Sequence, residues 1–173
     1  FSAVFELTPL ARIVSQWFGR TVIKSDYRFA YENAQQVIEA GAKAMGMEMR
    51  GGTDGVEENT VIPAHMKEAV LKLNSLATKL RKKRFASGAI SFERPEMKVV
   101  VDEKGRPVDV YQKVSVEANW LIEEFMLLAN RSVAEFVARK CKGKTFVYRV
   151  HDEPNQEKLE NLKLFISNFG YRM

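Results

Sequence analysis

The chain has 173 residues, 46% of them hydrophobic and 28% charged, and its 27 Lys and Arg exceed its 22 Asp and Glu to give a net charge of +5. Hydrophobic residues recur along the whole length, which excludes a disordered chain, and no apolar run approaches the roughly 20 residues of a membrane span. The mild basic excess permits an anionic partner such as nucleic acid. The single cysteine, Cys141, cannot form an internal disulfide, which indicates a reducing, cytoplasmic setting.

The first half of the chain predicts a strand hairpin followed by two helices. Residues 2–7 and 11–23 are rich in β-branched and aromatic residues, which is typical of strands. The pair Ser25-Asp26 offers an N-cap for a helix that extends to about residue 45. Residues 46–60 contain glycines and acidic residues without hydrophobic periodicity and predict a mobile surface loop. A second helix is predicted over 63–84, with Pro63 in its first turn.

The second half predicts more strands and two further helices. A short strand is expected at 89–92, a hairpin at 97–101 and 108–114, and another strand at 146–150. Helices are expected at 115–140 and 154–168. The inward faces should consist of Ile122, Phe125, Ala129, Val133 and Phe136 in the first of these helices, and of Leu159, Leu162, Phe165, Ile166 and Phe169 in the second.

This order of elements predicts an α+β fold in which a mixed, largely antiparallel sheet packs with three or four long helices. The chain opens directly on a strand-like segment and closes just after a helix stop signal, Gly170. Complete domains usually have polar, frayed ends, so we expect this chain to be cut from something longer.

Several kinds of active site are missing from the sequence. It contains no glycine-rich phosphate-binding loop, no H-E-x-x-H pair and no D-x-D-D cluster of carboxylates. A nucleophilic pair of Cys141 and His151 is conceivable, although a lone cysteine is more often a small buried hydrophobe. The residues by themselves therefore indicate a globular domain without a self-contained active site.

A basic run ends the second predicted helix and is followed by two aromatic residues, Phe85 and Phe92. The run consists of Lys79, Arg81, Lys82, Lys83 and Arg84. Cations that hold phosphates next to rings that stack on bases suit single-stranded nucleic acid. The alternative is a solvated face, because the helix dipole favours cations at a C-terminus. Phe92 falls at the end of a predicted strand, where side chains often leave the core.

The long predicted helix carries two polar rows. At about 100° per residue, Asn119, Glu123 and Asn130 fall within roughly 40° of one another. Trp120 and Leu127 lie between this row and a second, charged row. The first row would face a cleft, or it belongs to one broad wet face on which Trp120 lies. The charged row, expected to face solvent, contains Glu117, Glu124, Arg131 and Glu135.

Four segments resemble the RNase II / RNase R family of exoribonucleases, and the RNase R branch more than RNase II. They occur in the family's order and extend over nearly the whole chain: Ile23–Glu32, Arg84–Glu96, Leu121–Asn130 and Tyr148–Pro154. The resemblance implies a hydrolytic, processive 3′→5′ exoribonuclease that acts on single-stranded RNA with Mg²⁺. We expect neither a membrane nor DNA to be a partner.

The resemblance also implies roles for single residues. Tyr31 matches a tyrosine that lines the catalytic cavity, Phe92 an aromatic that stacks on the terminal bases, and Glu123 a glutamate that contacts the 3′-terminal nucleotide. With the basic residues Arg81, Lys82, Lys83 and Arg84, these form the expected RNA-binding set.

The catalytic part of the family pattern is not in this chain. The metal-binding D-x₅-D-x-D-D stretch is expected before Phe1, and the S-P-I-R-R-Y segment after Met173. We therefore expect residues 1–173 to be the central segment of one RNB catalytic domain, with Mg²⁺ held by Asp residues outside it. No catalytic or metal-binding residue is expected within the segment, which should be inactive alone. Alternatives are a non-catalytic RNA-binding module or decoy, and a structural fragment without RNA affinity.

Overall fold

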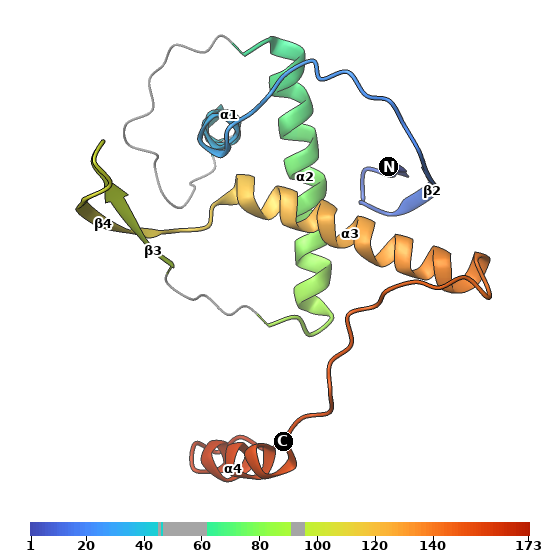
Figure 1. The fold of residues 1–173 in the computed structure, drawn as a ribbon, viewed down its shortest axis with the longest axis vertical. Helices are drawn as coiled ribbons and strands as arrows, with labels where there is room; N and C mark the ends of the chain where they lie inside the picture. Colours follow the sequence, from blue (N-terminus) through green and yellow to red (C-terminus); the bar gives the residue numbers. More distant parts are fainter. Residues whose placement is uncertain (45, 47–61, 91–95) are drawn as a thin grey trace. The chain divides into compact units, whose positions relative to one another are not determined.

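The computed structural model describes residues 1–44, 46, 62–90 and 96–173, which divide into two compact units, Phe1–Glu135 and Phe136–Met173. The α+β prediction is confirmed. The described strands form two separate two-stranded antiparallel sheets, β1 with β2 and β3 with β4. The elements in chain order (Figure 1) are β1 (Ser2–Leu7), β2 (Ile13–Gly19), α1 (Tyr31–Ala44), α2 (Ala64–Ala86), β3 (Glu96–Val101), β4 (Pro107–Lys113), α3 (Glu117–Lys140) and α4 (Gln156–Ser167).

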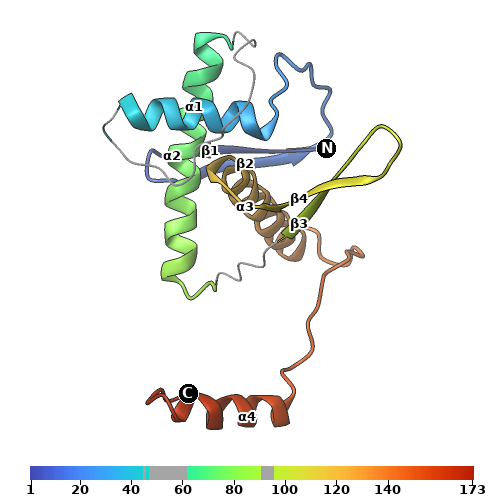
Figure 2. The ribbon, with the colours of Figure 1, turned by 90° about the vertical axis from the view of Figure 1, so that its left-hand side faces the viewer.

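The core of the first unit lies where α1, α2 and α3 meet. Each helix contributes two buried hydrophobic residues to it: Val37 and Ile38, Val70 and Ala77, Ala118 and Leu121. Figure 2 shows α1 lying across α2 near this point. Gly41 of α1 faces Leu71 of α2, and a Cβ at position 41 would require the end of the Leu71 side chain to move.

The predicted inward face of α3 is wrong at its two ends. Ile122 and Phe136 are exposed, whereas the buried residues of this helix are Ala118, Leu121, Glu124 and Ser132. Apolar residues occur on more than one side of α3, and in the described chain the side that contacts α1 and α2 is the buried one. Periodicity alone could not choose between these sides.

The first hairpin is held by the end of α2. Ala11 in its turn has φ of 53°, and Lys83 Nζ donates to the carbonyls of Leu10 (3.0 Å) and Ala11 (3.2 Å). Lys79 Nζ likewise donates to the carbonyl of Pro9 at 2.9 Å. The predicted strand over 11–23 ends early, because the pairing with β1 stops where Gly19 faces Ser2.

The first helix begins later than predicted. Ser25 does not act as an N-cap; its hydroxyl donates to the carbonyl of Tyr27 at 3.5 Å, and α1 starts at Tyr31. The rings of Tyr27 and Phe29 lie 4.5 Å apart. Side chains two positions apart do not face each other on a helix, so this contact is consistent with a segment that is not yet helical.

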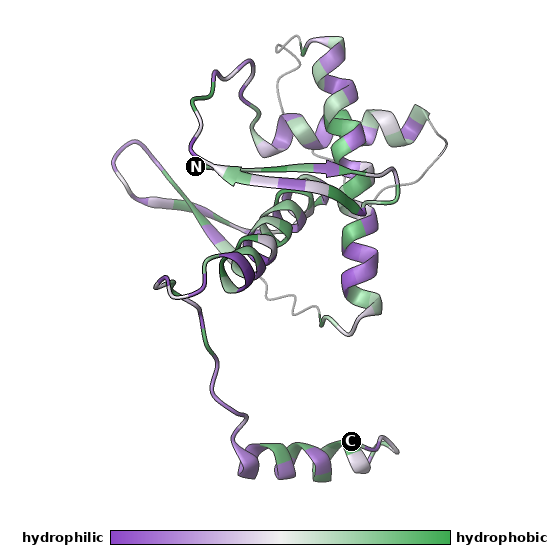
Figure 3. Ribbon diagram, turned by 90° about the vertical axis from the view of Figure 1, so that its right-hand side faces the viewer, coloured by the Kyte–Doolittle hydropathy of each residue, from purple (hydrophilic) through white to green (hydrophobic). Residues whose placement is uncertain are grey.

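The hairpin of β3 and β4 confirms the prediction, and its turn is organised by Asp102. Asp102 Oδ1 accepts from the backbone N–H groups of Lys104 and Arg106 at 2.9 Å each, and Gly105 adopts φ of 76°. Arg106 Nε donates to Oδ2 at 2.9 Å. Figure 3 shows hydrophilic residues at this turn and both hydrophobic and hydrophilic residues along the strands.

The order of this turn should depend on pH. The backbone N–H of Arg106, and then its side chain and Lys104, hold the pKa of Asp102 below its ordinary value. Because the pKa is lowered in the folded state, the ionised carboxylate stabilises the turn fully at pH values above the ordinary aspartate pKa. This stabilisation is lost as the pH falls through the lowered pKa of the folded state. We expect the amide NMR shifts of Lys104 and Arg106 to titrate with that lowered midpoint. Asp102→Asn keeps the acceptor oxygen and should abolish the titration; a wild-type midpoint at the ordinary value contradicts the prediction.

The second unit contains the end of α3 and all of α4. Asn155 caps α4 by accepting from Lys158 N at 3.0 Å, and Gly170 follows the helix with φ of 81°, as predicted. The strand predicted at 146–150 is absent from the described residues, because that segment pairs with no strand there. Within the second unit no residue of α4 is buried, so the residues predicted to face inward, among them Leu162, Phe165 and Phe169, pack on no core there.

Parts of two predictions lie outside the described residues. They are the second half of the strand at 89–92 and, apart from Gly46, the loop at 46–60. Among the helices that are described, none has the length and apolar character needed to cross a bilayer.

Candidate nucleic-acid interface

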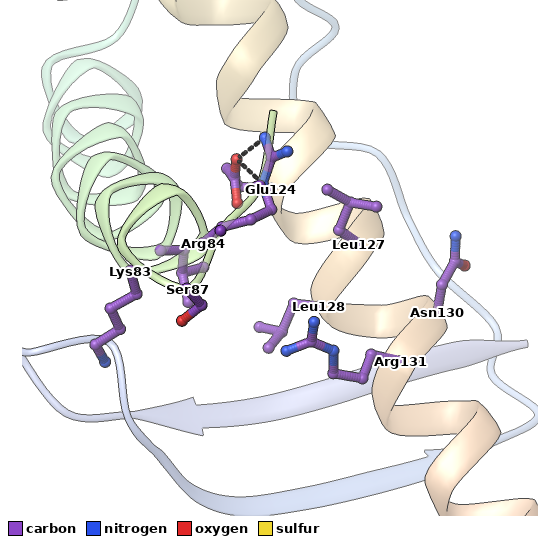
Figure 4. Close-up of a pocket in the computed structure, with 11 residues that line it drawn as sticks. Lys83, Arg84, Ser87, Glu124, Leu127, Leu128, Asn130 and Arg131 are labelled. Carbon is purple, nitrogen blue, oxygen red and sulfur yellow. Dashed lines mark hydrogen bonds and ion pairs between the residues drawn. The ribbon is translucent and has the colours of Figure 1, made fainter. Parts of the chain in front are cut away.

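The predicted basic run lies on the last turns of α2, where this helix meets α3. Arg84 makes the central contact: its Nε donates to Glu124 Oε1 at 3.0 Å and its Nη2 donates to the same oxygen (Figure 4). The Nη2 group also donates to Glu123 Oε1 at 2.8 Å. Glu124 is 3% exposed, whereas Glu123 is 41% exposed. One guanidinium therefore joins a buried and an exposed carboxylate of α3.

This contact has an electrostatic consequence. The hydrogen bond with Glu124, followed by the charges of both glutamates, raises the pKa of Arg84 above its ordinary value, although burial opposes the shift. Arg84 therefore stays charged at any pH at which the protein is folded. Glu124 belongs to the charged row that was predicted to face solvent. For this residue the prediction is wrong, because Glu124 is buried where α2 covers α3.

Arg81 takes part in the same cluster through two aromatic rings. Its guanidinium carbon lies 4.4 Å from the ring centroid of Trp120 and 4.8 Å from that of Phe85. Its Nη1 atom lies 3.9 Å from Glu123 Oε2. Stacking restricts the planar guanidinium, so the two oxygens of Glu123 face two cations held from different sides.

Two of the three lysines of the run, Lys82 and Lys83, differ from each other. Lys83 is committed to the carbonyls of the β1–β2 turn, whereas Lys82 is exposed and makes no hydrogen bond or ion pair within the described part of the chain. The basic run is thus neither a uniform solvated face nor an open cationic patch. Most of its charges are used to join α2 to α3 and to the first hairpin.

A cavity of about 650 Å³ adjoins this cluster, between the end of α2 and the middle of α3. Apolar lining comes from Leu80, Leu127 and Leu128, while Asn130 and Arg131 add polar groups. In Figure 4 the Arg131 side chain extends from α3 towards the end of α2. The cavity thus combines apolar wall with hydrogen-bond donors.

The row predicted to face a cleft divides into three environments. Asn130 lines the cavity and Glu123 pairs with the arginines. Asn119 Oδ1 accepts from the backbone N–H of Val116 at 3.0 Å, as the third helical residue does in a capping box. These three residues therefore do not act as one surface.

Of the two remaining predicted site residues, the structure describes only Tyr31, which makes no hydrogen bond, ion pair or ring contact with this cluster. Tyr31 is the first residue of α1 and is 48% exposed. Phe92 lies outside the described residues. The structure brings Arg81, Arg84 and Glu123 together, leaves Lys82 exposed and places Lys83 on the β1–β2 turn.

One residue that the sequence analysis missed supports α3 directly. Gln35 is fully buried, and its Oε1 accepts from the backbone N–H of Ala118 at 3.0 Å. Its Nε2 donates to Glu117 at 2.8 Å and to Glu39 at 3.0 Å. The signal was a glutamine at a position of α1 that shares the face of Ile38, because a polar residue among core positions implies a specific partner.

The metal that the resemblance implies does not fit the described residues. Among them no group of three or more His, Cys, Asp or Glu side chains could hold a metal ion. The two neighbouring carboxylates, Glu123 and Glu124, are already paired with arginine. We therefore assign no step to a metal here.

Comparison with known proteins assigns this chain to a family. Residues 1–171 match the RNB domain, so the chain belongs to the RNB domain family. It is 37% identical over 176 residues to DIS3-like exonuclease 2 of Schizosaccharomyces pombe (strain 972 / ATCC 24843), which covers 99% of this chain and 18% of that protein. The resemblance to RNase R is confirmed in the fold: the RNase R of Mycoplasma genitalium in complex with ribose methylated single-stranded RNA has a TM-score of 0.70 at 23% identity, over 96% of this chain and 23% of that one.

Not every relative is named as an active enzyme. The inactive exonuclease DIS3L2 of Arabidopsis thaliana is 32% identical over 177 residues, which cover 98% of this chain and 16% of that protein. The chain thus spans less than a fifth of the length of both curated relatives. Similarity over these residues places the chain in the family without distinguishing active from inactive members.

Proposed function

We propose that the protein containing this chain is a hydrolytic, processive 3′→5′ exoribonuclease that degrades single-stranded RNA with Mg²⁺ in the cytoplasm. DNA is not its substrate. Residues 1–173 are the central segment of its catalytic domain and supply part of the RNA-binding wall. The observation that carries the proposal is the match to the RNB domain over residues 1–171.

Two further observations support RNA as the ligand. A structure with the same fold is the single-stranded RNA complex of a ribonuclease. The end of α2 also presents an exposed cation, Lys82, close in sequence to Phe85 and to the predicted stacking residue Phe92. Stacking and phosphate contacts bind a strand of any sequence, as a degradative enzyme requires.

The test is an assay of the full-length protein on RNA that carries a label at its 5′ end. We expect stepwise loss of 3′ nucleotides with Mg²⁺, no loss with EDTA, and no shortening of DNA of the same sequence. Excess unlabelled RNA added after the start should not stop chains already engaged, which defines processive action. Internal cleavage, or equal degradation of DNA, contradicts the proposal.

The isolated 173-residue chain should show no nuclease activity, because the acidic metal cluster is expected outside it. The measurement is the same RNA assay on the repurified chain. Mg²⁺-dependent shortening that persists after repurification, and that Glu123→Gln abolishes, would overturn this expectation.

A second candidate is a non-catalytic RNA-binding module or decoy, which the inactive Arabidopsis relative favours. Single-stranded RNA binding by the full-length protein that weakens with salt and with Phe92→Ala, without any cleavage, would identify it. A protein that neither binds nor cleaves RNA would instead be a structural member of the family.

Lys82 should contribute the phosphate contact of the basic run. Its charge has no intramolecular partner within the described chain, whereas Lys83 and Arg84 donate to carbonyls and carboxylates. We expect Lys82→Ala to reduce the slope of log K against log salt for single-stranded RNA by about 0.7, the value for one phosphate contact.

The matched control is Lys72→Ala, which removes an exposed lysine earlier on α2. It should leave the slope unchanged. Equal slopes for the Lys82→Ala variant and the wild-type protein would mean that the run makes no phosphate contact through this residue.

A further inference from the structure

The cluster at the α2–α3 contact contains two adjacent carboxylates in different surroundings. Neighbouring residues on a helix point about 100° apart, so Glu124 is buried against α2 while Glu123 reaches the surface. To join the two helices, the pair of Arg84 and Glu124 would be enough, and Glu123 would not be needed. The pair with Glu123 is half exposed, and such pairs contribute only about 0–1 kcal/mol to stability. The pair with Glu123 therefore adds little to the contact between the two helices.

The geometry of Arg84 fixes the direction of its bond to Glu123. Nε and Nη2 both donate to Glu124 Oε1, so the guanidinium plane is set by a carboxylate that is itself buried. The same Nη2 atom then reaches Glu123 Oε1 at 2.8 Å. The planar guanidinium thus makes three hydrogen bonds to two carboxylates, which limits the orientations in which Glu123 keeps its bond to Arg84.

The other oxygen of Glu123 lies near a second cation. Glu123 Oε2 lies 3.9 Å from Arg81 Nη1, and Arg81 is packed against the rings of Trp120 and Phe85. The four charged groups sum to zero, so an exposed carboxylate can lie on this surface without repelling phosphates. An ionised carboxylate has about four acceptor sites. Those not used by the arginines can accept hydrogen bonds from a ligand.

We propose that Arg84 is a positioning residue for the RNA-binding wall: anchored by buried Glu124, it holds the exposed carboxylate of Glu123 in one orientation for hydrogen-bond donors of the bound RNA. The proposal rests on the proposed function. It also assigns different roles to the cations of the run: the two arginines act through Glu123, whereas Lys82 contacts phosphate.

The test is a double-mutant cycle in the full-length protein with Arg84→Lys and Glu123→Gln, measured as kcat/KM on single-stranded RNA. Lysine keeps the charge near Glu124 but cannot supply the planar fork to both carboxylates. We expect Arg84→Lys to lower kcat/KM about tenfold in the wild-type background and less than about twofold beside Glu123→Gln. Arg106→Lys, in the β3–β4 turn, is the matched control and should have the same small effect in both backgrounds.

The outcomes separate this proposal from the proposed function. An Arg84→Lys effect of equal size in both backgrounds, or no effect, overturns the positioning role while the enzyme remains an exoribonuclease. A wild-type protein that neither cleaves nor binds RNA overturns both. If Arg84→Lys does not fold, Glu124→Gln replaces it in the cycle, because it weakens the anchor of Arg84 without changing side-chain size, and the same coupling with Glu123→Gln is expected.

Discussion

Arg84→Met is expected to lower the free energy of unfolding by about 3–5 kcal/mol, the usual cost of removing one partner from a buried ion pair. The cost arises because Glu124, 3% exposed, would keep its charge in the interior without a cation. Methionine preserves most of the volume of the side chain, so loss of packing should contribute little. The measurement is urea denaturation at neutral pH.

Two companion variants show where that free energy comes from. Glu123→Gln should cost less than about 1 kcal/mol, because this carboxylate is half exposed and water can replace its partner. The double variant Arg84→Met with Glu124→Met should regain most of the loss, since it leaves no buried charge. A loss below about 1 kcal/mol in Arg84→Met alone would mean that Glu124 reaches water or another cation.

Features with local causes were predicted well from the sequence. The β3–β4 hairpin follows from two β-branched runs around Asp102–Arg106, a turn whose hydrogen bonds all lie within five residues. The long helices α2 and α3 follow from unbroken periodicity. Pro63, predicted in the first turn of α2, is the N-cap residue directly before it. In each case the interactions that decide the structure lie within the same short segment of sequence that predicts it.

Features that depend on a partner elsewhere in the chain were predicted less well. The strand expected at 146–150 has suitable residues, yet no described strand pairs with it. The beginning of α1 was misplaced: the Ser25 hydroxyl donates to the carbonyl of Tyr27 instead of capping a helix, and the rings of Tyr27 and Phe29 pack together before α1 begins. The sequence of a segment indicates which strand or cap it can form, but pairing and packing with the rest of the chain decide which structure it adopts.

The same distinction applies to the candidate site. Composition located the basic run, but its charges are taken up by groups about 40 to 70 residues away, such as Glu124 for Arg84 and the carbonyl of Leu10 for Lys83. No spacing rule connects such pairs. Glu124 looked like a solvent-facing residue because its own helix gives no sign that α2 covers it.

Gln35→Glu is expected to lower the free energy of unfolding by about 2–4 kcal/mol at neutral pH, from a lost donor and a new like charge. Gln35 Nε2 now donates to both Glu39 and Glu117, so a carboxylate in its place would meet two others in a buried position. Burial and like charges raise the pKa of the introduced carboxyl group above its value in the unfolded chain. The variant should therefore gain stability relative to wild type as the pH falls from neutral through that raised pKa.

Gln35→Leu separates the charge from the loss of hydrogen bonding. It leaves the backbone N–H of buried Ala118 without its acceptor, which should cost about 1–3 kcal/mol at every pH. Urea denaturation of both variants from neutral to mildly acid pH gives the comparison. Gln35→Glu should be the less stable at neutral pH, and the difference should close in acid, because a protonated carboxyl can donate one hydrogen bond and accept another where leucine can do neither. A difference that does not change with pH would mean that the introduced carboxyl reaches solvent, and that the start of α3 is open at this position.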